Sequence, residues 1–278
     1  MPYSEILYTA ADRIATITLN RPDKLNAWTA VMEREVRQAM GEAESDENVR
    51  VIILTGAGRG FCAGADMSLL SGIAEQGLGS HAQNHALSNS NNQAGRTGTR
   101  PDFQKKYSYF PSLTKPVIAA VSGPAVGLGF ILSLYCDLRF ASETAKFGTA
   151  FARRGLIAEY GLAWLLPRLI GPANALDMLF SARLVEASDA LRMGLVNRIF
   201  PSDQFTEGVY AYARELAYGV SARSMRIIKA QVYNAMFQTL GEAFESSEAE
   251  MLLSLESQDF KEGVAHFMEK RVPVFTQK

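Results

Sequence analysis

The stretch VIILTGAGRGFCAGADM, residues 51–67, decides the fold class of this 278-residue chain. The segment in which it begins, residues 49–55 (VRVIILT), is almost wholly apolar and rich in β-branched residues, which is typical of a strand buried on both faces of a parallel sheet. Four glycines follow between Gly56 and Gly64, where the backbone must adopt an unusual φ or approach another segment closely. A buried strand that enters a glycine-rich turn predicts an α/β fold.

A second unit of the same kind begins at Val117. Residues 117–121 (VIAAV) run into the turn SGPAVGLGF and then into an apolar helix. Residues 117–136 carry no charge over the length that a bilayer requires, but Ser122, Gly123 and Pro124 interrupt them, so we predict strand, turn and buried helix and no membrane span. Ligands of open α/β sheets bind at the carboxyl ends of the strands, so both turns are expected to face one site.

The flanking segments extend this pattern. Residues 5–9 and 13–19 alternate and predict a hairpin. Residues 28–44 predict a helix capped by Thr29, which with strand 49–55 makes a right-handed crossover. The apolar face of that helix consists of Met32, Val36, Ala39, Met40 and Ala43. Residues 71–100, rich in Gly, Ser, Asn and Gln, are either a surface lid or a spacer without a role.

After Phe147, the apolar residues recur at the spacing of helices. Helices are predicted over 161–170, 173–180 and 187–193, then a short strand over 195–200 and long helices from Asp203 onward. We therefore divide the chain into an α/β core, residues 1–200, and a helical C-terminal region, residues 201–278, that serves oligomerisation and covers a neighbour's site.

Composition excludes several classes of function. Lys and Arg number 28 against 29 Asp and Glu, which leaves no basic excess for nucleic acid. Two cysteines, Cys62 and Cys136, and three histidines form neither a disulfide framework nor a zinc-binding pattern, so we expect no metal and a cytoplasmic location. The first twenty residues lack the basic and apolar regions of a secretory signal.

Seven segments in consistent order resemble the enoyl-CoA hydratase/isomerase (crotonase) superfamily. They are RPDKLNA (21–27), VIILTGAGRGFCAGADM (51–67), KPVIAAVSGPAVGLGF (115–130), CDLRFAS (136–142), AKFG (145–148), MGLVNRIF (193–200) and EGVAHFMEKR (262–271). The resemblance implies a repeated ββα core, assembly as homotrimers or hexamers, and an acyl-CoA thioester as substrate. Coenzyme A belongs to the substrate, so no separate cofactor is expected.

In that family, backbone N–H groups after the two glycine-rich turns hold the thioester oxygen. Carried onto this sequence, these groups belong to Ala65 and Leu128. Fixed N–H donors favour an enolate oxygen, which gains charge in the transition state, over the ground state. Tight packing of helix on strand is the structural alternative for both turns.

The resemblance also implies a coenzyme-binding set. It consists of Lys24, Leu25, Ala63, Asp66 and Met67, and of Phe267 and Lys270 reaching the nucleotide of a neighbouring subunit. A lysine can meet a phosphate as a point charge. The alternative for Lys270 is an ordinary solvated helix charge.

The two glutamates of the family's hydratases are replaced by Ile131 and Phe151. Asp137, Glu143 and Glu159 are the acidic residues between Gly123 and Trp164, and we expect the first to be structural and the second solvated. Glu159 lies in an apolar segment before a helix, where a carboxylate is either desolvated or paired. Its position resembles that of the acidic residue in dienoyl-CoA isomerases and in a dehalogenating relative, so it is the candidate general acid/base. The structural alternatives are that the helix dipole stabilises the Glu159 carboxylate at the start of the helix, or that this carboxylate forms an ion pair with Arg153 or Arg154.

These observations predict an acyl-CoA enzyme that stabilises a thioester enolate and moves a proton with Glu159. One carboxylate suits double-bond isomerisation better than water addition, although membership of the family favours hydration. Two alternatives stay open: a non-catalytic acyl-CoA-binding scaffold, and a thioester hydrolase or dehalogenase-like enzyme with Glu159 as nucleophile.

Overall fold

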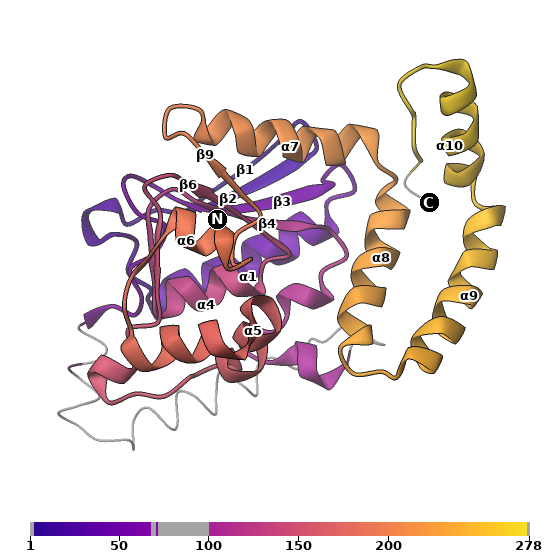
Figure 1. Ribbon diagram of the computed structural model, residues 1–278. Coiled ribbons are helices and arrows are strands. Elements are labelled where there is room, and N and C mark those ends of the chain that lie inside the picture. Colours follow the sequence, from indigo (N-terminus) through magenta and orange to yellow (C-terminus); the bar gives the residue numbers. More distant parts are fainter. Residues whose placement is uncertain (1–2, 68–70, 72–99, 277–278) are drawn as a thin grey trace.

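A computed structural model describes residues 3–67, 71 and 100–276 of the chain. Its main sheet has six strands in the order β1 (Ile6–Ala11), β2 (Ile14–Leu19), β3 (Val51–Gly56), β4 (Val117–Val121), β6 (Leu138–Ser142) and β9 (Arg198–Phe200) (Figure 1). β1 is antiparallel to β2, and every other neighbouring pair is parallel. A smaller sheet contains β5 (Pro124–Val126), β7 (Lys146–Gly148) and β8 (Val185–Glu186). The predicted α/β class, the hairpin and both buried strands are confirmed.

The predicted crossover joins β2 to β3 through α1 (Ala30–Ser45). The five residues predicted to form its apolar face are the five that it buries, because they recur at the helical period. The Thr29 hydroxyl accepts a hydrogen bond of 3.0 Å from the Met32 amide, so the predicted cap is also confirmed.

Helices cover both faces of the main sheet. α1 and α4 (Leu128–Tyr135) lie on one face, and α7 (Phe205–Gly219) lies on the other (Figure 1). Side chains of a strand alternate between the faces, so Ile52 and Leu54 join the first layer while Val51 and Ile53 pack toward α7. This double cover explains why β3 is apolar throughout.

The uncharged stretch 117–136 forms the predicted strand, β4, and the predicted buried helix, α4. The glycine-rich segment between them differs from the expected turn, because residues 124–126 form the short strand β5. In the described part of the chain, no helix combines the length and the hydrophobicity needed to cross a membrane.

The remaining helices come after β7 in the chain. They are α5 (Leu162–Ser181), α6 (Ala187–Arg192), α8 (Ala222–Ala235), α9 (Leu240–Glu256) and α10 (Gln258–Glu269). The two helices predicted over 161–170 and 173–180 are confirmed: both lie within α5, which is broken at Gly171, where the φ of +76° and ψ of +158° are not helical. The predicted strand 195–200 begins only at Arg198, because the Leu195 amide donates to the Ala190 carbonyl and closes the end of α6.

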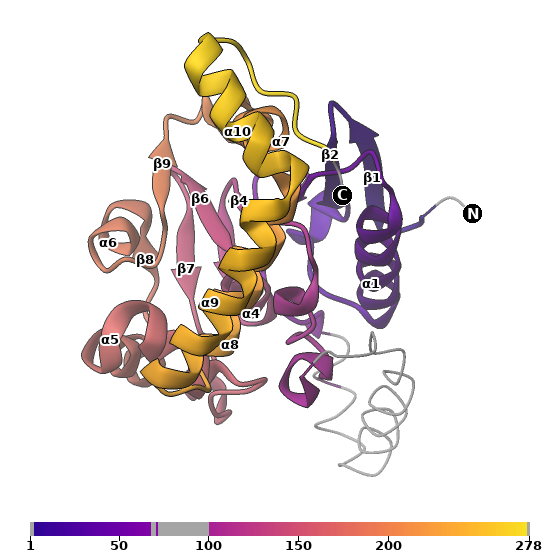
Figure 2. The same cartoon turned by 90° about the vertical axis from the view of Figure 1, so that its right-hand side faces the viewer.

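The C-terminal helices α8, α9 and α10 stand beside the sheet and cross the molecule in Figure 2. α8 is tied to the core by Lys229, whose ammonium lies 2.7 Å from the Asp137 carboxylate at the start of β6. α7, in contrast, packs directly on the sheet. The division at residue 200 stays a prediction.

Candidate active site

The two glycine-rich turns lie against each other. Cys62 and Ala125 form a parallel β-bridge, and the Val126 amide donates to the Cys62 carbonyl at 2.9 Å. A Cβ atom on Gly129 would lie 2.2 Å from that carbonyl oxygen, so only glycine allows this contact. The two turns therefore meet beyond the carboxyl ends of β3 and β4, and the expectation that they face one binding site stays a prediction.

The amides of Ala65 and Leu128 follow glycines with positive φ, +101° at Gly64 and +55° at Gly127. Trp28 pairs with the residues on either side of Ala65: its amide donates to the Gly64 carbonyl, and its carbonyl accepts from the Asp66 amide. The Ala65 N–H therefore faces away from Trp28. The Leu128 N–H lies at the first turn of α4, where a helix leaves its amides unpaired. Within the described residues, neither amide donates to a backbone carbonyl.

A buried amide side chain that the sequence analysis missed holds the first turn. Asn26 is fully buried; its side chain accepts from the Arg21 amide at 2.9 Å and donates to the Ala57 and Gly60 carbonyls at 2.9 and 2.8 Å. Its φ is +56°, in the left-handed region that asparagine tolerates better than most residues. In the sequence, Asn26 belongs to the family-like segment RPDKLNA, and its place shortly before the predicted cap Thr29 is the local signal that it carries.

An ion pair between Arg21 and Asp66 also stabilises the backbone beside the first glycine-rich turn. The Arg21 guanidinium lies 2.9 Å from the Asp66 carboxylate and donates to the Ala27 carbonyl at 2.6 Å. Asp66, predicted to line the coenzyme site, is thus already engaged by Arg21. The ion pair is about one-fifth exposed, and it fixes the residue next to Ala65.

The other residues predicted to bind the coenzyme lie on the two adjoining loops. The Ala63 amide donates to the Leu25 carbonyl at 3.0 Å, which joins the loops. Lys24, at the end of the 3-10 helix Pro22–Lys24, and Met67 are exposed. Phe267 and Lys270 lie on and just after α10, which packs against α9; both are exposed, and Lys270 ends the helix with a φ of +54°.

Glu159 lies in the turn before α5, as predicted, and its carbonyl accepts from the Leu162 amide at 2.9 Å. The side chain is half-buried. Its apolar neighbours differ from expectation: Leu156 and Ile157 are 38% and 78% exposed, because this turn lies at the surface of the chain. Burial, followed by the nearby Glu159 carboxylate, raises the pKa of Tyr160 to about 12.

The positions that would carry the hydratase carboxylates are apolar and buried. Ile131 lies in α4 and is 1% exposed, and Phe151 is 6% exposed. Asp137 accepts from the Lys229 ammonium and from the Val117 amide, so it has the structural role predicted for it. Glu143 is exposed in a turn, where its carboxylate accepts from the Ser202 amide at 3.0 Å.

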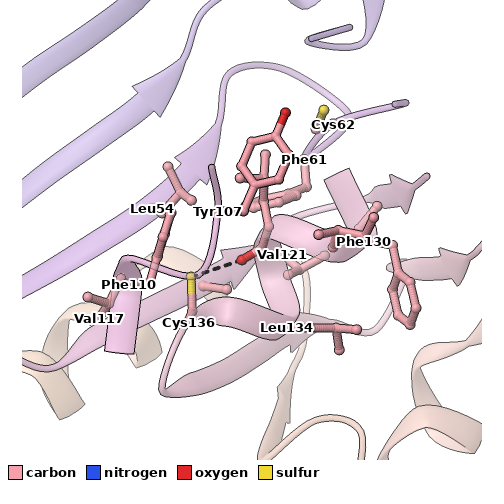
Figure 3. Packing of buried hydrophobic residues seen from close by; sticks show 14 of the residues in the cluster. Leu54, Phe61, Cys62, Tyr107, Phe110, Val117, Val121, Phe130, Leu134 and Cys136 are labelled. Carbon is pink, nitrogen blue, oxygen red and sulfur yellow. Dashed lines mark hydrogen bonds between the residues drawn. The ribbon is translucent and has the colours of Figure 1, made fainter. Parts of the chain in front are cut away.

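An aromatic row connects Trp28, next to Ala65, with the Glu159 turn. The rings of Trp28 and Tyr107 are 6.2 Å apart, and those of Tyr107 and Tyr160 are 4.9 Å apart, both edge to face. In Figure 3 the Tyr107 hydroxyl is directed away from Phe110 and Cys136, toward the side on which Cys62 lies. Burial is the largest cause that raises the pKa of Tyr107 well above its ordinary value, so the hydroxyl is neutral. The predicted lid, residues 71–100, lies outside the described residues except at its two ends.

Comparison with known proteins agrees with this geometry. The profile of the enoyl-CoA hydratase/isomerase family matches residues 9–278. The chain is 35% identical over 274 residues to "Probable enoyl-CoA hydratase EchA12" of Mycobacterium tuberculosis, covering 95% of this chain and 89% of that protein. It is 32% identical over 273 residues to 1,2-epoxyphenylacetyl-CoA isomerase of Escherichia coli, covering 95% of each. The enoyl-CoA hydratase structure from Bacillus anthracis superposes with a TM-score of 0.87 at 27% identity, covering 99% of this chain and all of that one.

Proposed function

Because the chain belongs to the enoyl-CoA hydratase/isomerase family, we propose that it rearranges an acyl-CoA thioester through an enolate held by the Ala65 and Leu128 amides, with Glu159 moving the proton. The observation that carries this proposal is the contact between the two glycine-rich turns, each of which ends in an amide without a backbone acceptor among the described residues. Two such donors stabilise a developing oxyanion, and loss of one costs about 3 kcal/mol in comparable sites.

We infer isomerisation over hydration. Hydration in this family uses two carboxylates, but Ile131 and Phe151 are buried apolar residues here. A single carboxylate can remove a proton from one carbon and return it to another. One of the relatives is named 1,2-epoxyphenylacetyl-CoA isomerase, which is consistent with this assignment.

The same absence of both hydratase glutamates favours a second candidate, an acyl-CoA-binding scaffold without turnover. Glu159 argues for catalysis, because its position resembles the one where dienoyl-CoA isomerases carry their acidic residue, and its side chain is half-buried in the turn before α5. In the nucleophilic alternative, Glu159 would attack the substrate directly and release free coenzyme A or a leaving group.

We further propose that Lys24, Leu25, Ala63, Asp66 and Met67 bind the coenzyme, and that Phe267 and Lys270 reach the coenzyme of a neighbouring subunit in a cytoplasmic homotrimer or hexamer. Exposed apolar side chains on α9 and α10 support an assembly, because isolated chains rarely leave such a set in water. They are Leu240, Phe244, Met251, Leu252, Leu253, Leu255, Phe260, Val264, Phe267 and Met268.

The test follows the ultraviolet absorbance of the conjugated thioester with crotonyl-CoA and with a 3-enoyl-CoA, using Glu159→Gln as the matched variant. We expect the band to grow from the 3-enoyl ester and to stay unchanged with Glu159→Gln, which should still bind acyl-CoA and fold. Loss of the band from crotonyl-CoA would establish hydration. Release of free thiol would establish hydrolysis, and tight binding without any turnover would establish the scaffold.

A further inference from the structure

The turn that carries Glu159 has a backbone conformation that its own residues do not favour. The Leu162 amide donates to the Glu159 carbonyl at 2.9 Å, and the two residues between them have positive φ, +51° at Tyr160 and +76° at Gly161. These are the features of a type I′ turn, whose first central position is usually Gly, Asn or Asp. Tyrosine disfavours this conformation, so the surrounding structure must hold the turn.

Tyr135, the last residue of α4, makes the contact that holds the backbone of the turn. Its hydroxyl donates to the Tyr160 carbonyl at 2.6 Å. Gly161 packs against the same hydroxyl, because a Cβ atom there would lie 2.8 Å from the Tyr135 oxygen. Burial raises the pKa of Tyr135 to about 12, so the hydroxyl keeps its proton and can donate.

The ring of Tyr160 is held separately from its backbone. It packs edge to face on Tyr107, at 4.9 Å between ring centroids. Loss of the Tyr135 hydroxyl should therefore free the backbone of the turn and leave the packing of these rings in place.

Helix α4 connects this contact to the proposed oxyanion donor. The helix begins at Leu128 and ends at Tyr135, about 10 Å farther along its axis. Residues 129–134 between them are buried and close-packed, so the helix is a rigid connection. α4 also contacts α5, which starts directly after the Glu159 turn (Figure 1). The place of Glu159 relative to the Leu128 amide therefore depends on how the turn is attached to α4.

We propose that Tyr135 is a positioning residue for the proposed reaction: its hydroxyl fixes the Glu159 turn to α4, and with it the distance between the base and the Leu128 amide. This inference rests on the proposed function, because it takes Glu159 as the base and Leu128 as a donor to the enolate. Tyr135 acts through the turn and not on the reacting atoms. A base displaced by about 1 Å loses much of its rate, because proton transfer requires hydrogen-bond distance.

The test compares Tyr135→Phe, which removes only the hydroxyl, with the matched control Tyr210→Phe. The Tyr210 hydroxyl on α7 makes a hydrogen bond of the same length, 2.6 Å, with the Thr16 hydroxyl on the other face of the main sheet. Isomerisation of a 3-enoyl-CoA gives kcat and KM for each protein. We expect Tyr135→Phe to lower kcat about 10- to 100-fold and to change KM by less than about twofold. Tyr210→Phe should leave both constants unchanged.

A double-mutant cycle tests whether the effect passes through the turn. Gly161→Ala places a Cβ atom against the Tyr135 hydroxyl and so disturbs the same contact. The double variant should therefore be about as slow as Gly161→Ala alone. In the free protein, amide hydrogen exchange of residues 156–163 should be faster in Tyr135→Phe than in the wild type, and unchanged in Tyr210→Phe. Additive effects on kcat, or unchanged exchange in Tyr135→Phe, would overturn the inference.

The outcomes separate this inference from the proposed function. Normal turnover by Tyr135→Phe would overturn the inference and leave the proposed function standing. A wild type that converts no ester would refute the proposed function, and the catalytic role of Tyr135 would fall with it; the exchange data would then show only whether Tyr135 holds the turn. A loss of acyl-CoA binding as large as the loss of kcat, with a much lower melting temperature, would show a purely structural role and overturn the inference.

Discussion

Replacing Asn26 with alanine should loosen the first glycine-rich turn. The side chain makes three hydrogen bonds of 2.8 to 2.9 Å, one from the Arg21 amide and two to the Ala57 and Gly60 carbonyls. No solvent reaches the residue, so water cannot replace the lost partners without a rearrangement. Alanine must also adopt the φ of +56° that asparagine tolerates.

The magnitude follows from these contacts. Each lost hydrogen bond costs about 1 kcal/mol, and alanine in the left-handed region costs about 1 kcal/mol more. We therefore expect Asn26→Ala to lower the free energy of unfolding by about 4 kcal/mol. For a chain of this size, that corresponds to a fall of about 10 °C in melting temperature. Turnover should fall as well, because the same turn carries Ala65.

Thermal and urea unfolding monitored by circular dichroism measure the effect. The matched control is Asn174→Ala on α5, where the side chain makes one hydrogen bond of 2.9 Å to the Ile170 carbonyl and alanine suits a helix. If Asn26→Ala lowers the transition no more than Asn174→Ala, the network of Asn26 does not hold the turn and the reasoning fails.

Asn26→Asp tests only the two hydrogen bonds that the side chain donates. An ionised carboxylate can still accept from the Arg21 amide, but it cannot donate to the Ala57 and Gly60 carbonyls. Burial should raise the pKa of the new carboxyl in the folded state above its unfolded value. The protonated form can donate, so stability relative to the wild type should be highest below the unfolded pKa, near 4, and fall as pH rises through the folded pKa. A deficit that is constant from pH 4 to pH 8 would contradict this account.

Other substitutions test the contact between the turns, the buried thiols and the anchor of α8. Gly129→Ala should prevent native folding or abolish activity, because its Cβ would meet the Cys62 carbonyl. The control Gly41→Ala in α1 has open space around its Cβ and should stabilise the fold by about 0.5–1 kcal/mol. Equal melting temperatures of the two variants would refute the close contact between the turns. Burial raises the pKa of Cys62 to about 12 and also raises that of Cys136. Neither thiol of the native protein should therefore react with a disulfide reagent at pH 8, while both should react in urea. Rapid labelling of the native protein would show that the buried thiols become exposed by local opening. Lys229→Met should destabilise by about 3 kcal/mol, because the aspartate that pairs with it loses its cation; denaturant midpoints within 0.2 M of the wild type would count against this.

Much of the fold could be predicted from local patterns. α1 buries the five residues that its 3.6-residue period selects, and β3 and β4 coincide with apolar β-branched runs. The predicted break between residues 170 and 173 also occurs, at Gly171 in α5, whereas the strand predicted from residue 195 starts only at Arg198 because the preceding residues close α6. Such boundaries depend on backbone hydrogen bonds that a pattern of side chains does not specify.

The two glycine-rich turns were predictable, because a run of glycines after a buried strand indicates an unusual backbone. The Ala65 and Leu128 amides were named only through the family resemblance, and their role stays a prediction. Asn26 could not be assigned in this way, since two of its three partners lie 31 and 34 residues away. Tyr107 gave no local signal of being buried between Trp28 and Tyr160.

The sequence by itself determined the α/β class, the crossover helix and the position of both glycine-rich turns, because period, β-branching and glycine act within a few residues. Only the tertiary structure decided that Gly129 packs on Cys62, that Asp66 pairs with Arg21, and that an aromatic row links Trp28 to Tyr160. These relations join residues far apart in the chain, and they arise because parallel strands bring the ends of separate segments to one edge of the sheet.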